Sequence, residues 1–275
     1  MRQDDASSNR SRTSIVVDDV SVSFPIYHGG SRSLKKSLLH RGSRGHIAND
    51  ANDRVVVEAL RNISLEFQVG DRVAIIGANG AGKTTLLRVL AGIYEPVAGR
   101  VLTSGRISPM FDIGLGIDLE LSGRENVYLR ALLLGLSSRD IDAKIDDIVA
   151  FTQLDDYLEL PVRTYSSGMI TRLTFAVATC FAPEILLMDE WILAGDQQFM
   201  ARAEQRIASF ISNASILVLA SHSQDIVKRW CNKAVWLDGG AVKSVGPVEE
   251  TLAAYQAEYG GGTTAAPAAT DALTA

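Results

Sequence analysis

One short stretch, GANGAGKTT at residues 77–85, limits the possible folds of this chain more than any other feature. It follows the apolar run RVAII and precedes TLLRVLAG, in which apolar residues recur at helical spacing. The pattern GxxxxGK(S/T) between a strand and a helix is typical of a phosphate-binding loop at the edge of a parallel sheet. The sequence therefore predicts an α/β fold whose sheet carries a phosphate site.

The residue types in this loop suit phosphate binding. Glycines let the backbone curl so that successive N–H groups converge on phosphate oxygens. Lys83 adds a point charge near the β and γ phosphates, and the Thr84 hydroxyl can ligate Mg²⁺. A glycine-rich turn without a ligand would need neither a lysine nor a hydroxyl at these positions. We therefore expect a nucleotide to contact Gly77, Ala78, Asn79, Gly80, Ala81, Gly82, Lys83, Thr84 and Thr85.

Two further strands are followed by residues that can act on a phosphate. The run ILLMDE (185–190) places Asp189 and Glu190 at the carboxyl end of a buried strand, where α/β sheets bind ligands. Asp189 would hold Mg²⁺, and Glu190 would be the base, or the water-orienting group, for attack on the γ phosphate. His222 follows the strand ASILVLA, from which its imidazole could reach the same phosphate. The alternatives are two solvated acids that lead into a loop and a histidine with a structural role.

The rest of the chain alternates short β-branched runs with helical patterns, which indicates a parallel central sheet. Between about 120 and 182 the strand signal disappears. There SGRE (122–125) and SSRD (137–140) have the spacing of capping boxes that open two helices. We therefore expect a helical subdomain at about 115–182.

The last part of the sequence predicts a hairpin and a final helix. KAVWLDGGAVKSVG is expected to turn at Asp238 and Gly239, and Pro247 opens the helical pattern PVEETLAAYQAEY. Residues 1–14 lack an apolar run, and residues 259–275 are low in complexity. Both segments are expected to be disordered tails.

Composition excludes several classes of protein. The net charge of −5 argues against nucleic acid as the main partner. Cys180 and Cys231 lie in apolar or helical stretches without CxxC spacing, as expected of buried thiols in a reducing compartment. The longest apolar stretch begins at Leu173 and is broken by Pro183 and Glu184, so it is too short for a membrane span. If the protein works at a membrane, another component must hold it there.

The stretch YSSGM (165–169) opens a helical pattern and has two readings. Ser166 or Ser167 can be an N-cap, which accepts a hydrogen bond from a backbone N–H without a helical partner. Alternatively, the free N–H groups and partial positive charge of the helix start can bind an anion. The local sequence leaves both readings open.

The order of these motifs, from about residue 15 to 255, resembles that of ATP-binding cassette (ABC) ATPases. GANGAGKTT resembles their Walker A motif, YSSGM their signature, ILLMDE their Walker B motif, LAGD with Asp196 their D-loop, and Ser221-His222 their H-loop. The resemblance implies an ABC-type P-loop NTPase domain at 15–258, with a mostly parallel central sheet, an antiparallel β subdomain and an inserted helical subdomain. It also implies a head-to-tail homodimer around two Mg·ATP. In that dimer Ser166, Ser167 and Gly168 complete the site of the partner.

Some positions depart from the family pattern. The usual signature is LSGGQ, so Ser167 replaces the first glycine and Met169 the glutamine. Asp112, in SPMFDIG, stands where the family has a Q-loop glutamine, and an acid there could still reach Mg²⁺ through water. Phe24 occupies the position of the aromatic residue that stacks on adenine. Tyr27 is its rival, and a core position is the other reading of Phe24.

Several stretches, among them SGRENVYL and FPIYHGGSRSLKKSLLHR, resemble the ATPase subunits of polysaccharide exporters, in a short form without a carbohydrate-binding C-terminal domain. This resemblance implies a separate membrane-spanning permease that exports a lipid-linked chain of O-antigen, capsule or teichoic-acid type. The ATPase would be peripheral on the cytoplasmic face of the inner membrane. A coupling helix of the permease would enter a groove lined by residues around 112–135.

Two questions stay open at this point. The basic insert 28–54 suits either an anionic membrane surface or a solvated loop, because it carries Arg32, Lys35, Lys36, Arg41 and Arg44 and no acid between His28 and His46. Rival functions are an ABC ATPase for lipid, peptide or drug, a cassette ATPase that acts on DNA or ribosomes, and a nucleotide-binding regulator without turnover. The last conflicts with the presence of both Glu190 and His222.

Overall fold

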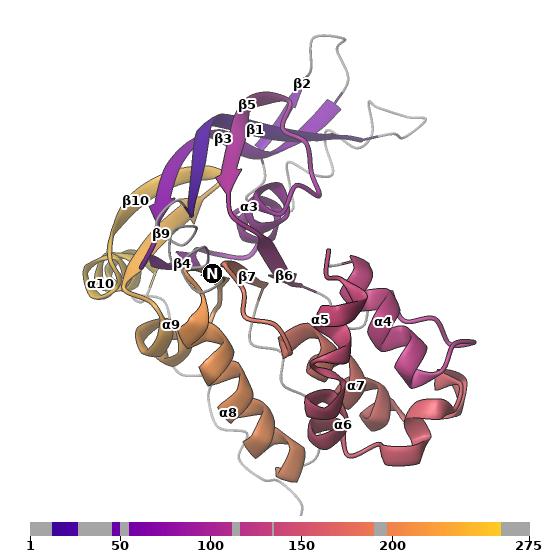
Figure 1. The fold of residues 1–275 in the computed structure, drawn as a ribbon. Coiled ribbons are helices and arrows are strands. Elements are labelled where there is room, and N and C mark those ends of the chain that lie inside the picture. Colours follow the sequence, from indigo (N-terminus) through magenta and orange to yellow (C-terminus); the bar gives the residue numbers. More distant parts are fainter. Residues whose placement is uncertain are drawn as a thin grey trace, which may run out of the picture.

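The computed structural model describes residues 13–26, 46–49, 55–111, 116–133, 135–189 and 197–259. These residues form two sheets and a group of helices. Figure 1 shows the sheets in its upper and left-hand part and the helices α4 to α7 as a separate group at the lower right. We call these two parts the sheet region and the helical region.

The first sheet is antiparallel and has the strand order β2-β3-β1-β5. Burial alternates along much of its two central strands, as expected when one face of a sheet covers a core. Asp19 and Asn62 both have positive φ, and the Asn62 amide donates to Asp19 Oδ1 (2.9 Å), at an irregularity where the β1–β3 register shifts. The runs VVVEAL (55–60) and ISLEF (63–67) belong to one strand, which passes through this irregularity. The strands are β1 (Ser14–Pro25), β2 (His46–Asn49), β3 (Val55–Gln68) and β5 (Ala98–Ser104).

The second sheet has the order β10-β9-β4-β8-β7-β6 and is parallel except for the β9–β10 hairpin. Alternate residues of β4 enter different cores. Val73 and Ile75 face a core shared with α3 and the antiparallel sheet, and Ala74 and Ile76 face a core shared with α8, α9 and α10. The strands are β4 (Arg72–Ile76), β6 (Ile107–Met110), β7 (Ile185–Asp189), β8 (Ile216–Ala220), β9 (Lys233–Asp238) and β10 (Ala241–Pro247).

Helices cover both faces of this sheet. The helix α3 (Lys83–Leu90) lies on the side of the antiparallel sheet. The other face carries α8 (Gln197–Asn213), α9 (Gln224–Trp230) and α10 (Val248–Tyr259). Because the parallel strands are covered on both faces, their apolar runs are continuous in the sequence.

The helical region has its own core. The two expected capping boxes are confirmed: Ser122 exchanges hydrogen bonds with Glu125, and Ser137 with Asp140. The hydrogen bonds from Ser122 also lower the pKa of the Glu125 carboxyl. The elements are α4 (Gly123–Leu133), α5 (Ser138–Asp142), α6 (Ile145–Thr152), the 3-10 helices η1 (Asp155–Glu159) and η2 (Val162–Thr164), and α7 (Ser167–Thr179).

The predicted α/β arrangement with its helical insert is confirmed, but the predicted hairpin turn was wrong by one residue. The turn lies at Gly239 and Gly240, and Asp238 pairs with Ala241 as the last residue of β9. Both glycines have positive φ (52° and 82°), as a two-residue hairpin turn of the primed type requires. No helix in the described residues is long and apolar enough to cross a membrane.

Candidate nucleotide-binding site

The glycine loop joins the end of β4 to the start of α3, as predicted. Gly77 and Gly82 have φ of 149° and 103°. A Cβ atom on Gly77 would lie 2.3 Å from the Leu237 carbonyl oxygen, and one on Gly82 would lie 2.7 Å from the Ala59 carbonyl oxygen. Both contacts are too short for any side chain, so packing within the chain itself requires glycine at these positions.

Lys83 is held inside the loop. Its side chain is buried, and Nζ donates hydrogen bonds to the carbonyl oxygens of Gly77 (2.9 Å) and Ala78 (3.1 Å). The ammonium group is therefore placed by the loop itself, beside the N–H groups at the start of α3. This arrangement concentrates positive charge where a phosphate group would approach.

The loop forms one wall of an open cleft of about 390 Å³. Asp189 ends β7 and stands in register with Ala220, the last residue of the adjacent strand β8. Because parallel strands end at the same edge, Asp189 and His222 meet the glycine loop in this cleft. The residues around it are Val57, Glu58, Ala59, Asn79, Gly80, Gly82, Lys83, Thr84, Thr85, Asp189 and His222.

Ser221 supports the segment that carries His222. The Ser221 hydroxyl is buried and accepts a hydrogen bond from the Ser223 N–H (3.1 Å). Ser223 in turn caps α9 by accepting from the Ile226 N–H. The exposed His222 is thus fixed between a strand end and a capped helix.

Phe24 lies next to a residue that lines the cleft. It lies opposite Val57 in the β1–β3 ladder, and directly opposite residues of an antiparallel pair project from the same face of the sheet. The ring is 37% exposed and packs edge-on against Tyr94, with ring centres 5.2 Å apart. The reading of Phe24 as a core residue was therefore wrong, whereas its role against adenine stays a prediction.

Sequence reasoning missed the contribution of β3 to the cleft. Val57, Glu58 and Ala59 line it opposite the glycine loop. They belong to an ordinary strand pattern without a recognisable motif, so only their pairing with β1 next to Phe24 indicates their position.

The YSSGM segment lies on the helical region, and its residues are not among those that line the cleft. Ser166 is the N-cap of α7 and accepts a hydrogen bond from the Met169 N–H (3.3 Å), so the capping reading is confirmed. Ser166, Ser167 and Gly168 are all exposed. A Cβ atom on Gly168 would meet only Ser166 Oγ, at 3.9 Å. The open helix start therefore faces outward, where a group from another molecule can reach it.

Four predicted site residues lie outside the described residues: Glu190, Asp196, Asp112 and Tyr27. The five basic residues of the insert also lie outside them. Their roles remain predictions from the sequence.

The oxygen donors of the cleft fit Mg²⁺. Thr84 and Asp189 offer a hydroxyl and a carboxylate, which are hard ligands of the kind that Mg²⁺ prefers. Among the described residues no group of three or more histidine, cysteine or acidic side chains could hold a metal by itself. Two protein oxygens beside a phosphate loop match an ion that completes its shell with phosphate oxygens and water.

Fold and cleft together define the class of the protein. A glycine loop between β4 and α3, with an acid and a histidine at the ends of β7 and β8, is the site of a P-loop nucleotide-binding protein. The solved structure titled "Structure of ATP binding subunit of ABC transporter" has the same fold, with a TM-score of 0.63 and 20% identity over 90% of this chain and 93% of that one.

Sequence comparison gives the family. The family model described as ABC transporter matches residues 60–193. The chain is 45% identical over 230 residues to the O-antigen export system ATP-binding protein RfbE of Yersinia enterocolitica, covering 84% of this chain and 96% of that protein. It is 40% identical over 250 residues to RfbB of Myxococcus xanthus, an O-antigen export system ATP-binding protein, covering 90% of this chain and 56% of that protein. The chain belongs to the ABC transporter family, as one of its ATP-binding proteins.

Proposed function

We propose that this protein is the ATP-hydrolysing subunit of an ABC transporter that exports a lipid-linked polysaccharide through a separate permease. The observation that carries the ATPase assignment is the cleft, which brings Lys83, Thr84, Asp189 and His222 to one place. The substrate class comes from the relatives, which are named for O-antigen export.

Each residue of the cleft has a role in this proposal. Lys83 and the N–H groups of the loop bind the β and γ phosphates, and the wall formed by Phe24 and Val57 receives the adenine ring. Thr84 and Asp189 hold Mg²⁺, which neutralises charge that develops on the phosphates. Glu190, next to Asp189, orients and deprotonates the attacking water, and His222 donates a hydrogen bond to the γ phosphate.

The exposed start of α7 belongs to a second site in this proposal. Ser166 to Gly168 of one copy close on the γ phosphate held by the glycine loop of another copy, so two ATP molecules are buried in a head-to-tail dimer. The helix start supplies N–H groups and partial positive charge for that phosphate. The open space around Gly168 supports this role, because no described residue of the same chain fills it.

Transport requires a membrane partner. A cytoplasmic helix of the permease would bind between the sheet region and the helical region, at residues around 112–135, and would hold the protein on the inner face of the membrane.

The ATPase assignment is tested by Glu190→Gln. We expect ATP to bind with unchanged affinity while turnover falls at least about a hundredfold, because the amide cannot accept the proton of the attacking water. The variant should accumulate as a nucleotide-bound dimer, measured by phosphate release and sedimentation. Glu204→Gln, the same change on the exposed face of α8, should behave as wild type. Wild-type turnover in Glu190→Gln would refute the assigned base.

The substrate assignment is tested by deletion of the protein in its host. We expect loss of the surface polysaccharide and accumulation of the lipid-linked polymer inside the cell. A normal surface polysaccharide with a defect in lipid, peptide or drug export would show instead that the ATPase serves another ABC transporter.

A further inference from the structure

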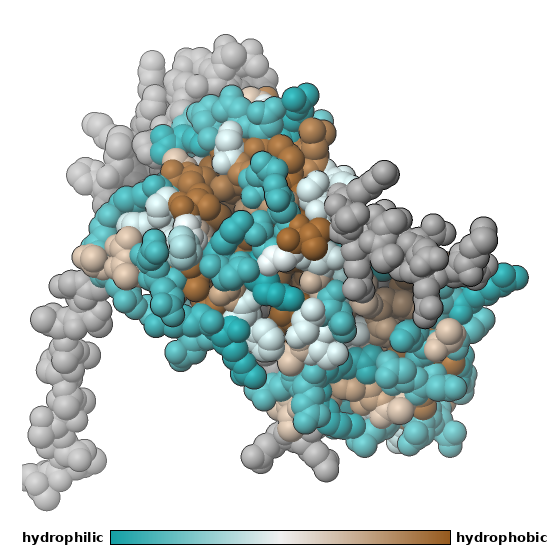
Figure 2. Space-filling model, turned by 60° about the vertical axis from the view of Figure 1, so that its left-hand side comes forward, coloured by the Kyte–Doolittle hydropathy of each residue, from teal (hydrophilic) through white to brown (hydrophobic). Residues whose placement is uncertain are grey.

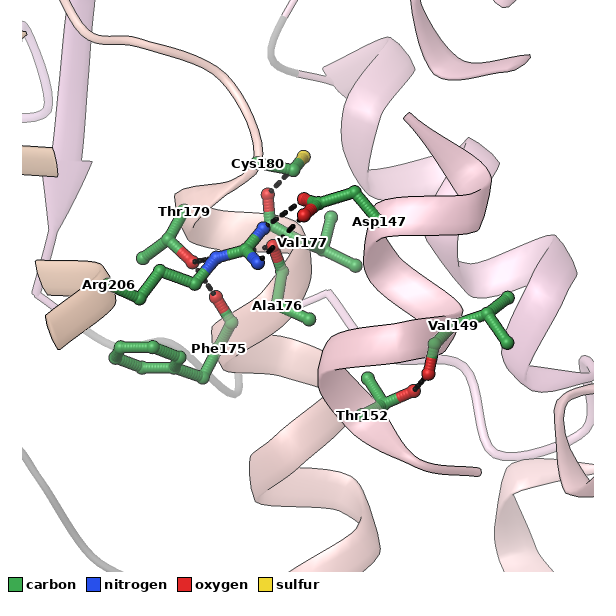
Figure 3. A network of polar contacts seen from close by, with 9 residues as sticks. All are labelled: Asp147, Val149, Thr152, Phe175, Ala176, Val177, Thr179, Cys180 and Arg206. Carbon is green, nitrogen blue, oxygen red and sulfur yellow. Dashed lines mark hydrogen bonds and ion pairs between the residues drawn. The ribbon is translucent and has the colours of Figure 1, made fainter. Parts of the chain in front are cut away.

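Arg206, on α8, joins the sheet region to the helical region. Its Nε donates to Thr179 Oγ1 of α7 (2.8 Å), and its Nη2 donates to Asp147 Oδ2 of α6 (2.5 Å), as Figure 3 shows. The guanidinium carbon also lies 4.4 Å from the centre of the Phe151 ring. Only 15% of the Arg206 side chain is exposed, whereas the Asp147 side chain is 51% exposed, so the largely buried guanidinium meets a carboxylate that reaches solvent. One guanidinium therefore bridges three helices.

The helix that carries Arg206 is fixed to the parallel sheet. Phe199, Ala203, Ile207 and Ile211 of α8 are buried in the core that contains residues of β4, β7 and β8. The same helix begins eight residues after Asp189, the acid of the cleft. The packing of α8 on the sheet therefore helps to set the position of Arg206, in a core to which Phe175 of α7 also contributes.

A second arginine reinforces the contact with α6. Arg202 lies one turn before Arg206 and donates to the Phe151 carbonyl oxygen (3.4 Å) and to Gln153 Oε1 (3.0 Å). These acceptors lie at the carboxyl end of α6, where a cation is favoured by the helix dipole and the unpaired carbonyls. The rings of Phe151, Phe175 and Phe199 pack together beside this contact, one from each of α6, α7 and α8.

The contact at Thr179 acts at one end of α7, and the exposed Ser166 lies at the other. Thr179 is buried, and its hydroxyl also bonds to the Phe175 carbonyl oxygen (2.7 Å), so Arg206 holds the helix and not only a side chain. A helix of 13 residues is about 20 Å long, so a tilt of about 10° at Thr179 would move its far end by about 3 Å. Such a movement exceeds the tolerance of a hydrogen bond to phosphate.

We propose that Arg206 is a positioning residue, which holds α7 at the angle that lets Ser166 to Gly168 close on the nucleotide of a second copy. The inference rests on the composite site proposed above. It adds that the geometry of that site is set inside each chain, by an ion pair that belongs to none of the motifs. The ion pair between Arg163 and Glu120 stays within the helical region and serves as a control.

The test uses Arg206→Met, which keeps an apolar stem beside Phe151 and removes every hydrogen bond of the guanidinium. In the Glu190→Gln background we expect the ATP concentration for half-maximal dimer formation to rise about tenfold. With Glu190 intact, we expect kcat to fall about tenfold while the affinity of the monomer for nucleotide stays within about twofold. Arg163→Met also breaks an ion pair, but it should change neither the ATP concentration for dimer formation nor kcat.

A second variant guards against misfolding of the first. Asp147→Asn leaves the guanidinium in place and weakens one of its contacts, so we expect a smaller shift in the same direction, about threefold. Spin labels at the exposed positions Asp156 and Glu66, one in each region, should give a broader distance distribution in Arg206→Met than in wild type. A purely structural role would lower thermal stability without this split between monomer binding and dimer formation.

The outcomes separate the inference from the function on which it rests. If Arg206→Met dimerises at the wild-type ATP concentration with an equally narrow distance distribution, the positioning role is wrong and the composite site stands. If the Glu190→Gln variant with Arg206 intact does not dimerise with ATP at all, the composite site fails and the positioning role fails with it.

Discussion

The two segments proposed to grip the γ phosphate need glycine for different reasons. In the loop, Gly77 and Gly82 have positive φ, and a side chain on either would collide with a backbone oxygen of the same chain. In α7, Gly168 has open space around it, with Ser166 Oγ at 3.9 Å as the nearest atom to an added Cβ. The loop needs glycine because of its own packing, whereas no contact among the described residues requires glycine at this position of α7.

The surface of the molecule shows a related contrast. On the face of the molecule drawn in Figure 2, the largest apolar areas lie in the upper half, and much of the remaining surface is hydrophilic. In the sheet region the exposed apolar residues include Phe24, the strand partner of the cleft residue Val57. The start of α7 instead exposes small and hydroxyl-bearing residues, which suit a phosphate better than an apolar partner.

The largest effect is expected from the loop side of this comparison. Lys83→Ala should lower ATP hydrolysis by about a hundredfold to a thousandfold, because it removes the charge that the loop holds against the phosphates. Phosphate release and nucleotide binding both measure it. Lys228→Ala, which removes an exposed lysine from α9, should leave both values unchanged. Retained hydrolysis in Lys83→Ala would show that the cleft is not the nucleotide site.

A matched pair of glycine substitutions sharpens the comparison most. Gly82→Ala should lower the free energy of unfolding by about 3 kcal/mol, because it adds a clash to a strained φ. Gly168→Ala should leave that free energy unchanged or raise it by about 0.5 kcal/mol, because alanine favours helix. Its ATPase activity should nevertheless fall about tenfold, since the added methyl lies where the partner's nucleotide approaches. Urea unfolding and phosphate release separate the two cases.

The comparison between the glycines would break if Gly168→Ala lost stability as Gly82→Ala does. It would also break if Gly168→Ala kept full activity in the presence of the permease, because the open space would then have no functional use.

A pair of N-caps tests the two readings of the signature serine. Ser166→Ala and Ser137→Ala each remove a capping hydroxyl and should each lower the free energy of unfolding by about 1 kcal/mol. Only Ser166→Ala should also lower ATP hydrolysis, by about tenfold, because α7, unlike α5, faces a phosphate in the proposed dimer. Equal, wild-type hydrolysis in both variants would leave capping as the whole role of Ser166.

The effect that is smallest at neutral pH concerns the two thiols, one in each region. Burial raises the pKa of Cys180 and of Cys231 to about 12. Below about pH 8 both thiols are neutral in the folded and the unfolded chain, so they add no pH dependence. Between about pH 9 and 12 the unfolded chain ionises them more than the folded chain does. The free energy of unfolding should therefore fall by up to about 1.4 kcal/mol per pH unit for each thiol in this range.

The thiols also report whether the regions unfold together. Cys180→Ala and Cys231→Ala should each remove half of this slope between pH 9 and 10, measured by urea unfolding, if the chain unfolds in one transition. If unfolding instead shows two transitions, and each substitution changes the pH dependence of only one of them, the helical and sheet regions unfold independently.

Local features of the fold were predictable from the sequence because their causes are local. The capping boxes at Ser122 and Ser137 need residues three apart, and the glycine loop needs only its own spacing between a strand and a helix. The hairpin turn was displaced by one residue because Asp-Gly and Gly-Gly both suit a primed turn, and only the pairing of Asp238 decides between them.

Features that depend on distant contacts were not predictable from the sequence. The edge strand β5 is exposed along most of its length, so its sequence lacks the alternation of apolar and polar residues that would predict a strand. Val57 lines the cleft because of its pairing with β1, and the contact between Arg206 and Asp147 joins residues 59 apart. Such positions carry no motif, and only the folded chain shows what they do.

The central claim is that hydrolysis takes place between two copies, and mixing two inactive variants tests it most directly. In a dimer of two Lys83→Ala copies both loops are defective, and in a dimer of two Gly168→Val copies both signatures are defective. A head-to-tail mixed dimer contains one intact site, in which the loop of the Gly168→Val copy faces the signature of the Lys83→Ala copy. We predict that the mixture hydrolyses ATP although neither variant does so alone. A mixture that forms mixed dimers and stays as inactive as its components would contradict the account.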